Sequence, residues 1–289
     1  MKVLITGSNG QLGSEIKELS SAYPLFDFLF TDVEELDITD VTKVNQFFRI
    51  HEPDVVINCA AYTAVDKAET DKDPAYLINA VAPGNLAHAA AKYGAFMVHI
   101  STDYVYDGTN CIPYIETDKI NPVSVYARSK AAGEKAVQQA GGKAIIIRTS
   151  WLYSAFGNNF IKTMIKYGTE RDTLNVVFDQ TGTPTYAYDL AKAILDILPQ
   201  AMVDDKIEVY HYSNEGVTSW YDFAKAIHSF AHVVCNVNPI PTKDYPLPAA
   251  RPFYSVLDKS KIKKKFHIGI PYWRDSVKDC IDRLGDFKN

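Results

Sequence analysis

The chain has 289 residues, enough for one large domain, or a large and a small one, with a sizeable buried core. Hydrophobic residues make up 47% and charged residues 22%, an ordinary balance for a soluble globular protein. The formal net charge of −5 argues against a general nucleic-acid binder, and no apolar run reaches the about 18 residues of a membrane helix. We therefore expect a cytoplasmic protein that binds neither nucleic acid nor membrane.

The chain opens with a short apolar strand over residues 2–6, which leads directly into a glycine-rich turn and an amphipathic helix. Gly7, Gly10 and Gly13 follow the spacing Gly-x-x-Gly-x-x-Gly, with Gln11 and Leu12 between the last two. Glycines permit a tight turn and close backbone approach, and a helix N-terminus offers free N–H groups and a favourable dipole to a pyrophosphate. The order of strand, turn and helix favours a dinucleotide site over an ordinary β–α turn.

A second apolar strand, over residues 25–30, leads to Asp32, about 20 residues past the glycine turn. A carboxylate in this place accepts hydrogen bonds from the adenosine ribose, and its charge resists a 2′-phosphate, so Asp32 favours NAD. Asp37 either reaches the adenine amine or serves as a plain turn residue. Thr39 is the expected N-cap of a helix over residues 40–48.

Further strands are expected over residues 54–61, 96–100 and 143–148, with a helix over residues 79–93. Strands that alternate with helices from the amino terminus predict an α/β fold, a Rossmann-type doubly wound parallel sheet. Ligands bind such sheets beyond the carboxyl ends of the strands. The glycine turn, Asp32, the segment 61–63 and Thr102 all follow strand ends, which strengthens the cofactor interpretation.

The order of elements becomes less regular after residue 198. Strands are expected at 175–178 and 209–212, and a proline-rich stretch covers residues 236–256. We predict an NAD(P)-binding Rossmann domain over residues 1–150 and a mixed region over 151–289. This second region completes the sheet and forms a small substrate-binding lobe over its carboxyl edge. The basic run 261–265 is interpreted as a solvated helix face, with an anion site as the alternative.

Tyr126 and Lys130 stand four residues apart at the start of a segment rich in Ala, Glu and Lys. In a helix they share one face, and an ammonium beside a phenol favours the phenolate. We therefore expect Lys130 to lower the pKa of Tyr126 from its usual value of about 10, which suits a proton donor in carbonyl reduction. Thr102 or Ser101 could complete the site by hydrogen-bonding the reacting oxygen. A solvated helix start would show the same spacing, so the cofactor motif is needed beside it.

The glycine motif and the Tyr-x-x-x-Lys pair together resemble the extended short-chain dehydrogenases/reductases. Further stretches narrow the resemblance to the dTDP-4-dehydrorhamnose reductase family; they are residues 60–69, 101–106, 148–153, 179–185 and 251–258. The matching motifs run in order from residue 3 to about residue 258. That family catalyses the last step of dTDP-L-rhamnose synthesis, in which NADPH or NADH reduces the 4-keto group of dTDP-4-dehydro-L-rhamnose.

The resemblance implies roles for the residues that match. Together with the glycine motif, it assigns to the cofactor Gly7, Gly10, Gln11, Leu12, Gly13, Asp32, Asp37, Ile38, Ala61, Tyr62, Thr63, Tyr126 and Lys130. It assigns to the substrate Thr102, Asp103, Trp151 and Arg251. In catalysis Thr102 polarises the ketone, Tyr126 donates the proton and Lys130 binds the nicotinamide ribose. Arg251 is a candidate for the diphosphate because a guanidinium matches phosphate oxygens, whereas Trp151 contacts the deoxysugar or is a core aromatic.

No metal site is predicted. The four cysteines lack Cys-x-x-Cys spacing, which favours buried, reduced thiols over disulfides or zinc. Some members of the family are magnesium-bridged dimers, but residues 186–189 contain no glutamate where a metal ligand would be expected. We therefore expect a monomer or homodimer whose partner is a small nucleotide sugar, and we assign no metal ligand.

Two other functions fit the same scaffold. A nucleotide-sugar epimerase or dehydratase would retain its NAD and share Tyr126 and Lys130. A dehydratase also needs an acid–base carboxylate pair, and here Thr102 is followed by Asp103 and Tyr104 without a glutamate. A non-catalytic regulatory subunit is the other alternative, because the regulatory subunit of methionine adenosyltransferase resembles this family. The intact set of Thr102, Tyr126 and Lys130 argues against lost catalysis.

Overall fold

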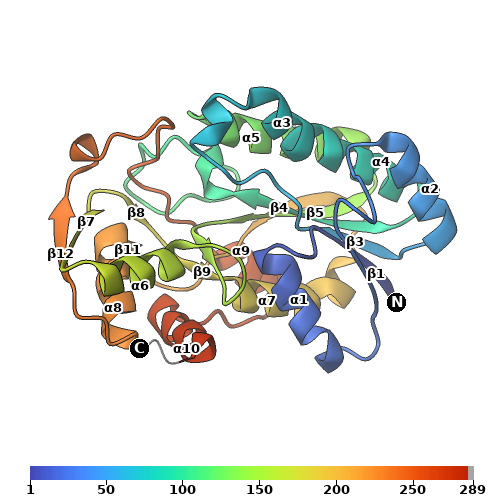
Figure 1. The fold of residues 1–289 in the computed structure, drawn as a ribbon. Helices are drawn as coiled ribbons and strands as arrows, with labels where there is room; N and C mark the ends of the chain where they lie inside the picture. The colour runs from blue at the N-terminus through green and yellow to red at the C-terminus, as the bar shows by residue number, and fades with distance from the viewer. Residues whose placement is uncertain (286–289) are drawn as a thin grey trace.

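The computed structural model describes residues 1–285, so residues 286–289 of the predicted second region lie outside the described residues. A six-stranded sheet in the order β10-β5-β4-β3-β1-β2 forms the centre of the molecule, and all its pairings are parallel (Figure 1). Its strands are β1 (Lys2–Thr6), β2 (Asp27–Thr31), β3 (Val55–Asn58), β4 (Phe96–Thr102), β5 (Lys143–Thr149) and β10 (Ile207–His211). The predicted Rossmann-type α/β fold is confirmed.

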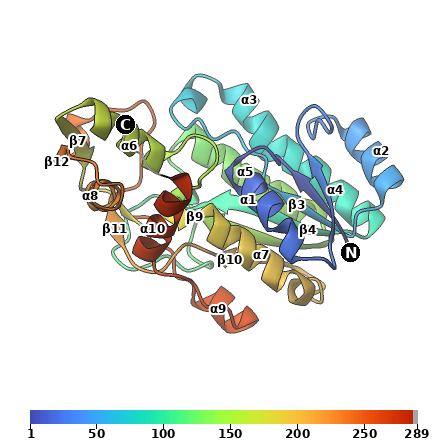
Figure 2. The same ribbon diagram turned by 60° about the horizontal axis from the view of Figure 1, so that its bottom comes forward.

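Helices cover both faces of the sheet because its strands are apolar on both sides. On one face lie α2 (Val41–His51), α3 (Lys72–Tyr76), α4 (Ala82–Tyr93) and α5 (Val125–Ala140). On the other face lie α1 (Gln11–Leu19), α7 (Ala187–Ala201) and α9 (Ser260–Phe266), as Figure 2 shows. Two buried apolar clusters result, one on each side. No helix within residues 1–285 is long and apolar enough to cross a membrane.

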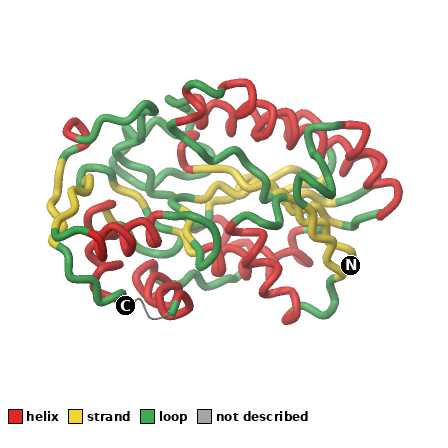
Figure 3. The backbone as a smooth tube through the Cα atoms, in the orientation of Figure 1, coloured by secondary structure: helices red, strands yellow, loops and turns green. Residues whose placement is uncertain are grey.

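A small lobe lies beyond the carboxyl ends of the strands and is rich in loops (Figure 3). Its helices are α6 (Phe160–Glu170), α8 (Trp220–Phe230) and α10 (Trp273–Leu284). Its strands are β6 (Leu152–Tyr153), β7 (Thr173–Val177), β8 (Thr181–Gly182), β9 (Thr185–Tyr186), β11 (Thr218–Ser219) and β12 (Asn236–Ile240). The strand expected at 175–178 is therefore β7, and it pairs with β12 rather than with the central sheet.

Two local predictions are wrong. The N-cap of α2 is Asp40 rather than Thr39, since the Asp40 carboxylate accepts the N–H groups of Thr42 and Lys43 at 2.8 and 3.2 Å. The helix expected at 79–93 begins earlier, because α3 continues through a π-helical segment, Leu77–Val81, into α4. The wider turn of that segment follows no sequence periodicity that distinguishes it from an α-helix.

A buried ion pair joins α5 to the sheet. Arg148 of β5 binds Glu134 of α5 through two parallel hydrogen bonds, Nε to Oε1 at 2.9 Å and Nη2 to Oε2 at 2.7 Å. Ser101 of β4 donates to the same carboxylate at 2.5 Å. Both charged side chains are at most 5% exposed, a burial that charged groups tolerate only when paired and hydrogen-bonded in this way.

The same arginine also reaches the sheet's last strand. Arg148 donates from Nη1 to the Tyr106 hydroxyl at 2.6 Å, and that hydroxyl is 2.9 Å from Nε2 of His211, at the end of β10. Burial lowers the pKa of His211 to about 3, so the imidazole stays neutral. The network thus fixes β4, β5, β10 and α5 relative to one another.

Candidate active site

The glycine turn lies where the strand order reverses, between β1 and β3. Gly7 has a φ of +66°, and a Cβ atom there would lie 2.7 Å from the backbone of Ala60, just after β3. At Gly13 a Cβ atom would lie 2.5 Å from the carbonyl oxygen of Gly7. Only glycine fits these two positions, and the turn consequently packs directly on the helix and on the neighbouring strand end.

The turn leaves backbone donors at the start of α1. Gly10 has no side chain to cap the helix, and the first hydrogen bond to its carbonyl oxygen comes from Ser14 at 2.9 Å. The N–H groups of Gln11, Leu12 and Gly13 therefore have no partner inside the helix. This glycine-lined cradle of free N–H groups at a helix N-terminus fits the pyrophosphate of a dinucleotide.

Asp32 follows β2 and is fixed by the backbone. Its Oδ2 accepts the N–H of Asn9, in the glycine turn, at 3.0 Å, and its Oδ1 accepts the N–H of Val33 at 2.9 Å. Asp37 accepts the N–H and hydroxyl of Thr39 at 3.0 and 2.6 Å, so it closes a turn, and Ile38 is buried in the core. The structure brings Asp32, but not the side chain of Ile38, to the cradle's surface.

The segment Ala61, Tyr62 and Thr63 follows β3 and is held by a residue that the sequence analysis did not single out. Asn79 accepts the N–H of Tyr62 at 2.9 Å and donates to its carbonyl oxygen at 3.0 Å. It also donates to Ser129 of α5 at 3.0 Å. Asn79 lies in the π-helical segment, whose altered turn directs this side chain inward; an isolated asparagine in a helical pattern gives no sequence signal for such a role.

Thr102 and Tyr126 meet above the end of β4. Thr102 is buried, donates to Oδ1 of Asp103 at 3.1 Å and accepts the N–H of Tyr104 at 3.2 Å. Burial raises the pKa of Tyr126 to about 12, and the nearby hydroxyl of Thr102 opposes this rise. The phenol is consequently protonated at neutral pH and lies beside the threonine hydroxyl.

Lys130 is buried one helical turn beyond Tyr126, but the predicted lowering of the tyrosine pKa is wrong for this structure. The ammonium donates to the carbonyl oxygen of Ile100 at 2.6 Å, and burial of the phenol dominates the pKa of Tyr126. Burial also lowers the pKa of Lys130 to about 8, which the nearby Glu134 partly counteracts. The position of Tyr126 and Lys130 on one helix face was therefore not sufficient to predict the pKa of Tyr126.

Asp103 and Trp151 line the same region. Burial raises the pKa of Asp103 to about 7, and the nearby hydroxyl groups of Ser255 and Thr102 partly oppose this rise. Trp151 has a left-handed backbone, with a φ of +47°, which costs a non-glycine residue on the order of 1–3 kcal/mol. Its indole is partly exposed and stacks on Trp220. A strained backbone and a partly exposed ring favour a surface role for Trp151 over a plain core position.

Arg251 pairs with a carboxylate that the sequence analysis assigned no role. Its Nη1 and Nη2 donate to the two carboxylate oxygens of Asp66 at 2.8 and 2.6 Å, and Nη1 also donates to the carbonyl oxygen of Ala249 at 2.7 Å. The pair lowers the pKa of Asp66. It joins the loop after β3 to the loop before α9, which are 185 positions apart in the chain.

No metal centre is found in the part of the chain that the structure describes. Asp189, near the place where a metal ligand was sought, is bound by Asn214 at 2.6 Å and Ser276 at 2.5 Å, and burial raises its pKa. The four cysteines are free. Cys280 is buried as predicted, whereas Cys59 and Cys235 are half-buried and Cys111 is exposed on a loop.

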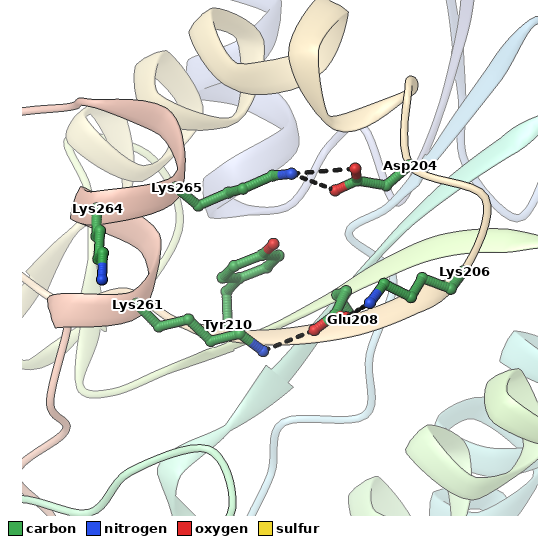
Figure 4. Close-up of a pocket in the computed structure, with 7 residues that line it drawn as sticks. All are labelled: Asp204, Lys206, Glu208, Tyr210, Lys261, Lys264 and Lys265. Carbon is green, nitrogen blue, oxygen red and sulfur yellow. Dashed lines mark hydrogen bonds and ion pairs between the residues drawn. The ribbon is translucent and has the colours of Figure 1, made fainter.

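The basic run forms α9, beside the hollow that Figure 4 shows. The hollow is lined by Asp204, Lys206, Glu208, Tyr210, Lys261, Lys264 and Lys265. Lys261 pairs with Glu208 and Lys265 with Asp204, each at 2.8 Å. These ion pairs compensate much of the positive charge and favour the helix-surface interpretation over an anion site.

The cradle and the group of Thr102, Tyr126 and Lys130 share the carboxyl edge of one parallel sheet. Together they define an NAD(P)-dependent oxidoreductase of the extended short-chain dehydrogenase/reductase class. Residues 1–285 match the family described as RmlD substrate binding domain. The dTDP-4-dehydrorhamnose reductase of Aggregatibacter actinomycetemcomitans is 42% identical, over 96% of this chain and 97% of its own length. The chain belongs to the dTDP-4-dehydrorhamnose reductase family.

Solved structures agree with this assignment. A dTDP-4-dehydrorhamnose reductase from Clostridium acetobutylicum superposes with a TM-score of 0.94 at 46% identity, covering 98% of this chain and 99% of that one. One from Bacillus anthracis, in complex with NADP, gives a TM-score of 0.91 at 40% identity with the same coverage.

Asp32 should set the choice between the two cofactors. We expect the wild type to use both, with a preference of at most about tenfold, or roughly 1.4 kcal/mol. Asp32→Ala removes the charge that repels a 2′-phosphate and should shift the ratio of kcat/KM values by about tenfold or more toward NADPH. Steady-state kinetics with both cofactors measures this ratio. Glu34→Ala removes an exposed charge nearby and should leave it unchanged; an unchanged ratio in Asp32→Ala would contradict the assignment.

Proposed function

We propose that this protein reduces the 4-keto group of dTDP-4-dehydro-L-rhamnose to give dTDP-L-rhamnose, with NADPH or NADH as the reductant. The observation that carries the proposal is the contact between Thr102 and Tyr126 beside the buried Lys130, at the edge that holds the glycine cradle. Membership of the reductase family supports the choice of substrate. We also propose a cytoplasmic location and a monomeric or homodimeric state.

The bound cofactor supplies a hydride to the ketone carbon. Negative charge then develops on the ketone oxygen, which needs a proton from a group within hydrogen-bond reach. Tyr126 is protonated at neutral pH and serves as this donor, while the hydroxyl of Thr102 stabilises the oxygen by a second hydrogen bond. Lys130 places a positive charge below the site and binds the nicotinamide ribose. In the substrate-free protein Thr102 donates its single O–H to Asp103, so this hydrogen must turn from Asp103 to the ketone oxygen when the substrate binds. Asp103 also contacts the deoxysugar.

The guanidinium of Arg251 binds the diphosphate of the substrate. In the substrate-free protein Asp66 neutralises this charge through a bidentate pair. A diphosphate must therefore share or replace Asp66 as the partner, and the measured affinity is the difference between the two interactions. Trp151 contributes an aromatic surface to the sugar.

Tyr126→Phe tests the chemistry. Loss of the phenolic oxygen should lower kcat by 10²–10⁴-fold, the usual contribution of a positioned proton donor, without unfolding the protein or preventing NADPH binding. NADPH oxidation, followed with the 4-keto sugar between pH 6 and 9, measures it. Tyr104→Phe, whose ring lies 6.0 Å from that of Tyr126, is the matched control and should stay active. If Tyr126→Phe keeps more than about a tenth of the activity, Tyr126 is not the acid.

Cofactor binding should weaken at alkaline pH. The pKa of Lys130 is about 8 in the cofactor-free protein, so its positive charge is present below pH 8 and is lost as the pH rises above it. The Kd for NADPH, measured by fluorescence, should therefore increase between pH 7 and 9. Lys130→Met keeps a similar stem without a charge and should bind weakly over the whole range, with no rise near pH 8. A wild-type Kd that is constant from pH 7 to 9 would contradict a role for the Lys130 charge in cofactor binding.

Arg251→Ala should raise KM for the nucleotide sugar ten- to a hundredfold, the loss expected for a charge-assisted contact of about 1.5–3 kcal/mol. Asp66→Asn removes the competing charge and should lower KM. Initial rates at saturating NADPH give both values. Arg274→Ala, on α10, is the control for loss of a positive charge. An unchanged KM in Arg251→Ala would make the ion pair with Asp66 purely structural.

A further inference from the structure

The indole of Trp151 rests on a second indole, that of Trp220. The two ring centroids are 3.6 Å apart and the planes differ by 9°, which is close face-to-face packing. Trp220 is the first residue of α8 and follows Ser219, whose hydroxyl caps that helix. Trp220 in turn packs on Phe160, with centroids 4.7 Å apart, and belongs to the rim of a buried aromatic cluster. The core of the small lobe thus supports Trp151 through Trp220.

The edge of the Trp151 indole lies against residues that connect it to the proposed catalytic group. A Cβ atom at Gly182 would lie 2.7 Å from Cε2 and Cζ2 of Trp151 and 2.9 Å from Oγ of Ser255. Trp151, Gly182 and Ser255 therefore meet at one point. The Ser255 hydroxyl lies close to the carboxylate of Asp103, the residue next to Thr102. A continuous line of contacts consequently runs from the indole to the proposed catalytic hydroxyl.

The backbone alone does not determine this ring orientation. Trp151 is held in the left-handed region, and its carbonyl oxygen accepts the N–H of Thr185 at 3.2 Å. Those contacts fix the Cα atom but leave the side-chain torsions free. Trp220 restricts one face of the ring and Gly182 leaves room for its edge, so together they select one placement.

We propose that Trp220 is a positioning residue for substrate recognition: it holds the Trp151 indole flat, as an apolar wall for the deoxysugar. Trp220 packs on Trp151 and affects the sugar only through the position of the Trp151 ring. The inference rests on the proposed function, since it takes the sugar of the nucleotide sugar as the group that packs on Trp151. On this proposal Trp220 is required for binding of the sugar, but not for binding of the nucleotide, the diphosphate or the cofactor.

Calorimetry with dTDP-L-rhamnose and with dTDP alone, each at saturating NADP, separates sugar recognition from nucleotide recognition. Trp220→Leu should weaken dTDP-L-rhamnose binding about three- to tenfold, the range of an aromatic pair, while dTDP and NADP binding change less than about twofold. Trp220→Phe retains a stacked ring and should restore the sugar affinity to within about twofold of wild type. Trp273→Phe changes another tryptophan of the same cluster and should leave the ratio of the two affinities unchanged.

Gly182→Ala provides an independent variant, because its methyl group displaces the indole edge while Trp220 itself is unchanged. It should show the same selective loss, and it decides the question if Trp220→Leu does not fold. Equal weakening of dTDP and dTDP-L-rhamnose, or no weakening, would overturn the positioning role. If wild type binds both ligands but does not reduce the 4-keto sugar, the proposed function fails while the positioning role can still be read from binding.

Discussion

The buried ion pair between Arg148 and Glu134 is the interaction on which the reaction edge of the sheet depends. It links β5 to α5, the helix that carries Tyr126 and Lys130, and through Ser101 it also links β4, which ends at Thr102. Removing one partner would leave an uncompensated charge in the core, typically a loss of 3–5 kcal/mol. The pair therefore couples the geometry of the proposed acid to the stability of the whole domain.

Much of the fold could be predicted because its determinants are local. Unbroken apolar runs identified the parallel strands, and glycine spacing after β1 identified the cradle, since both depend on neighbours in sequence. The position of β7 outside the sheet was not predictable in this way. Strand pairing there depends on β12, more than sixty residues away. The capping error at Thr39 arose because two adjacent residues were both suitable caps.

The sequence predicted which residues form the candidate site, but not their pKa values or their charged partners. Thr102 and Tyr126 do meet, but the pKa of Tyr126 moves upward, because burial is a property of the folded protein and not of the motif. Asp66 was missed as the partner of Arg251 for a related reason. Two side chains from distant loops leave no periodic pattern, and their pairing decides whether a positive charge is free or neutralised.

The edge position of β10 has a consequence for synthesis of the chain. This strand pairs with β5, and α7, which precedes it, supplies much of one apolar cluster that also contains Val3 and Ile5. A nascent chain that has emerged only as far as β5 lacks both, so it exposes the outer edge of β5 and part of its core. Long-range closure of this kind slows folding and exposes intermediates to aggregation. The first half therefore depends on the second to reach its native state, although it carries the cofactor cradle by itself.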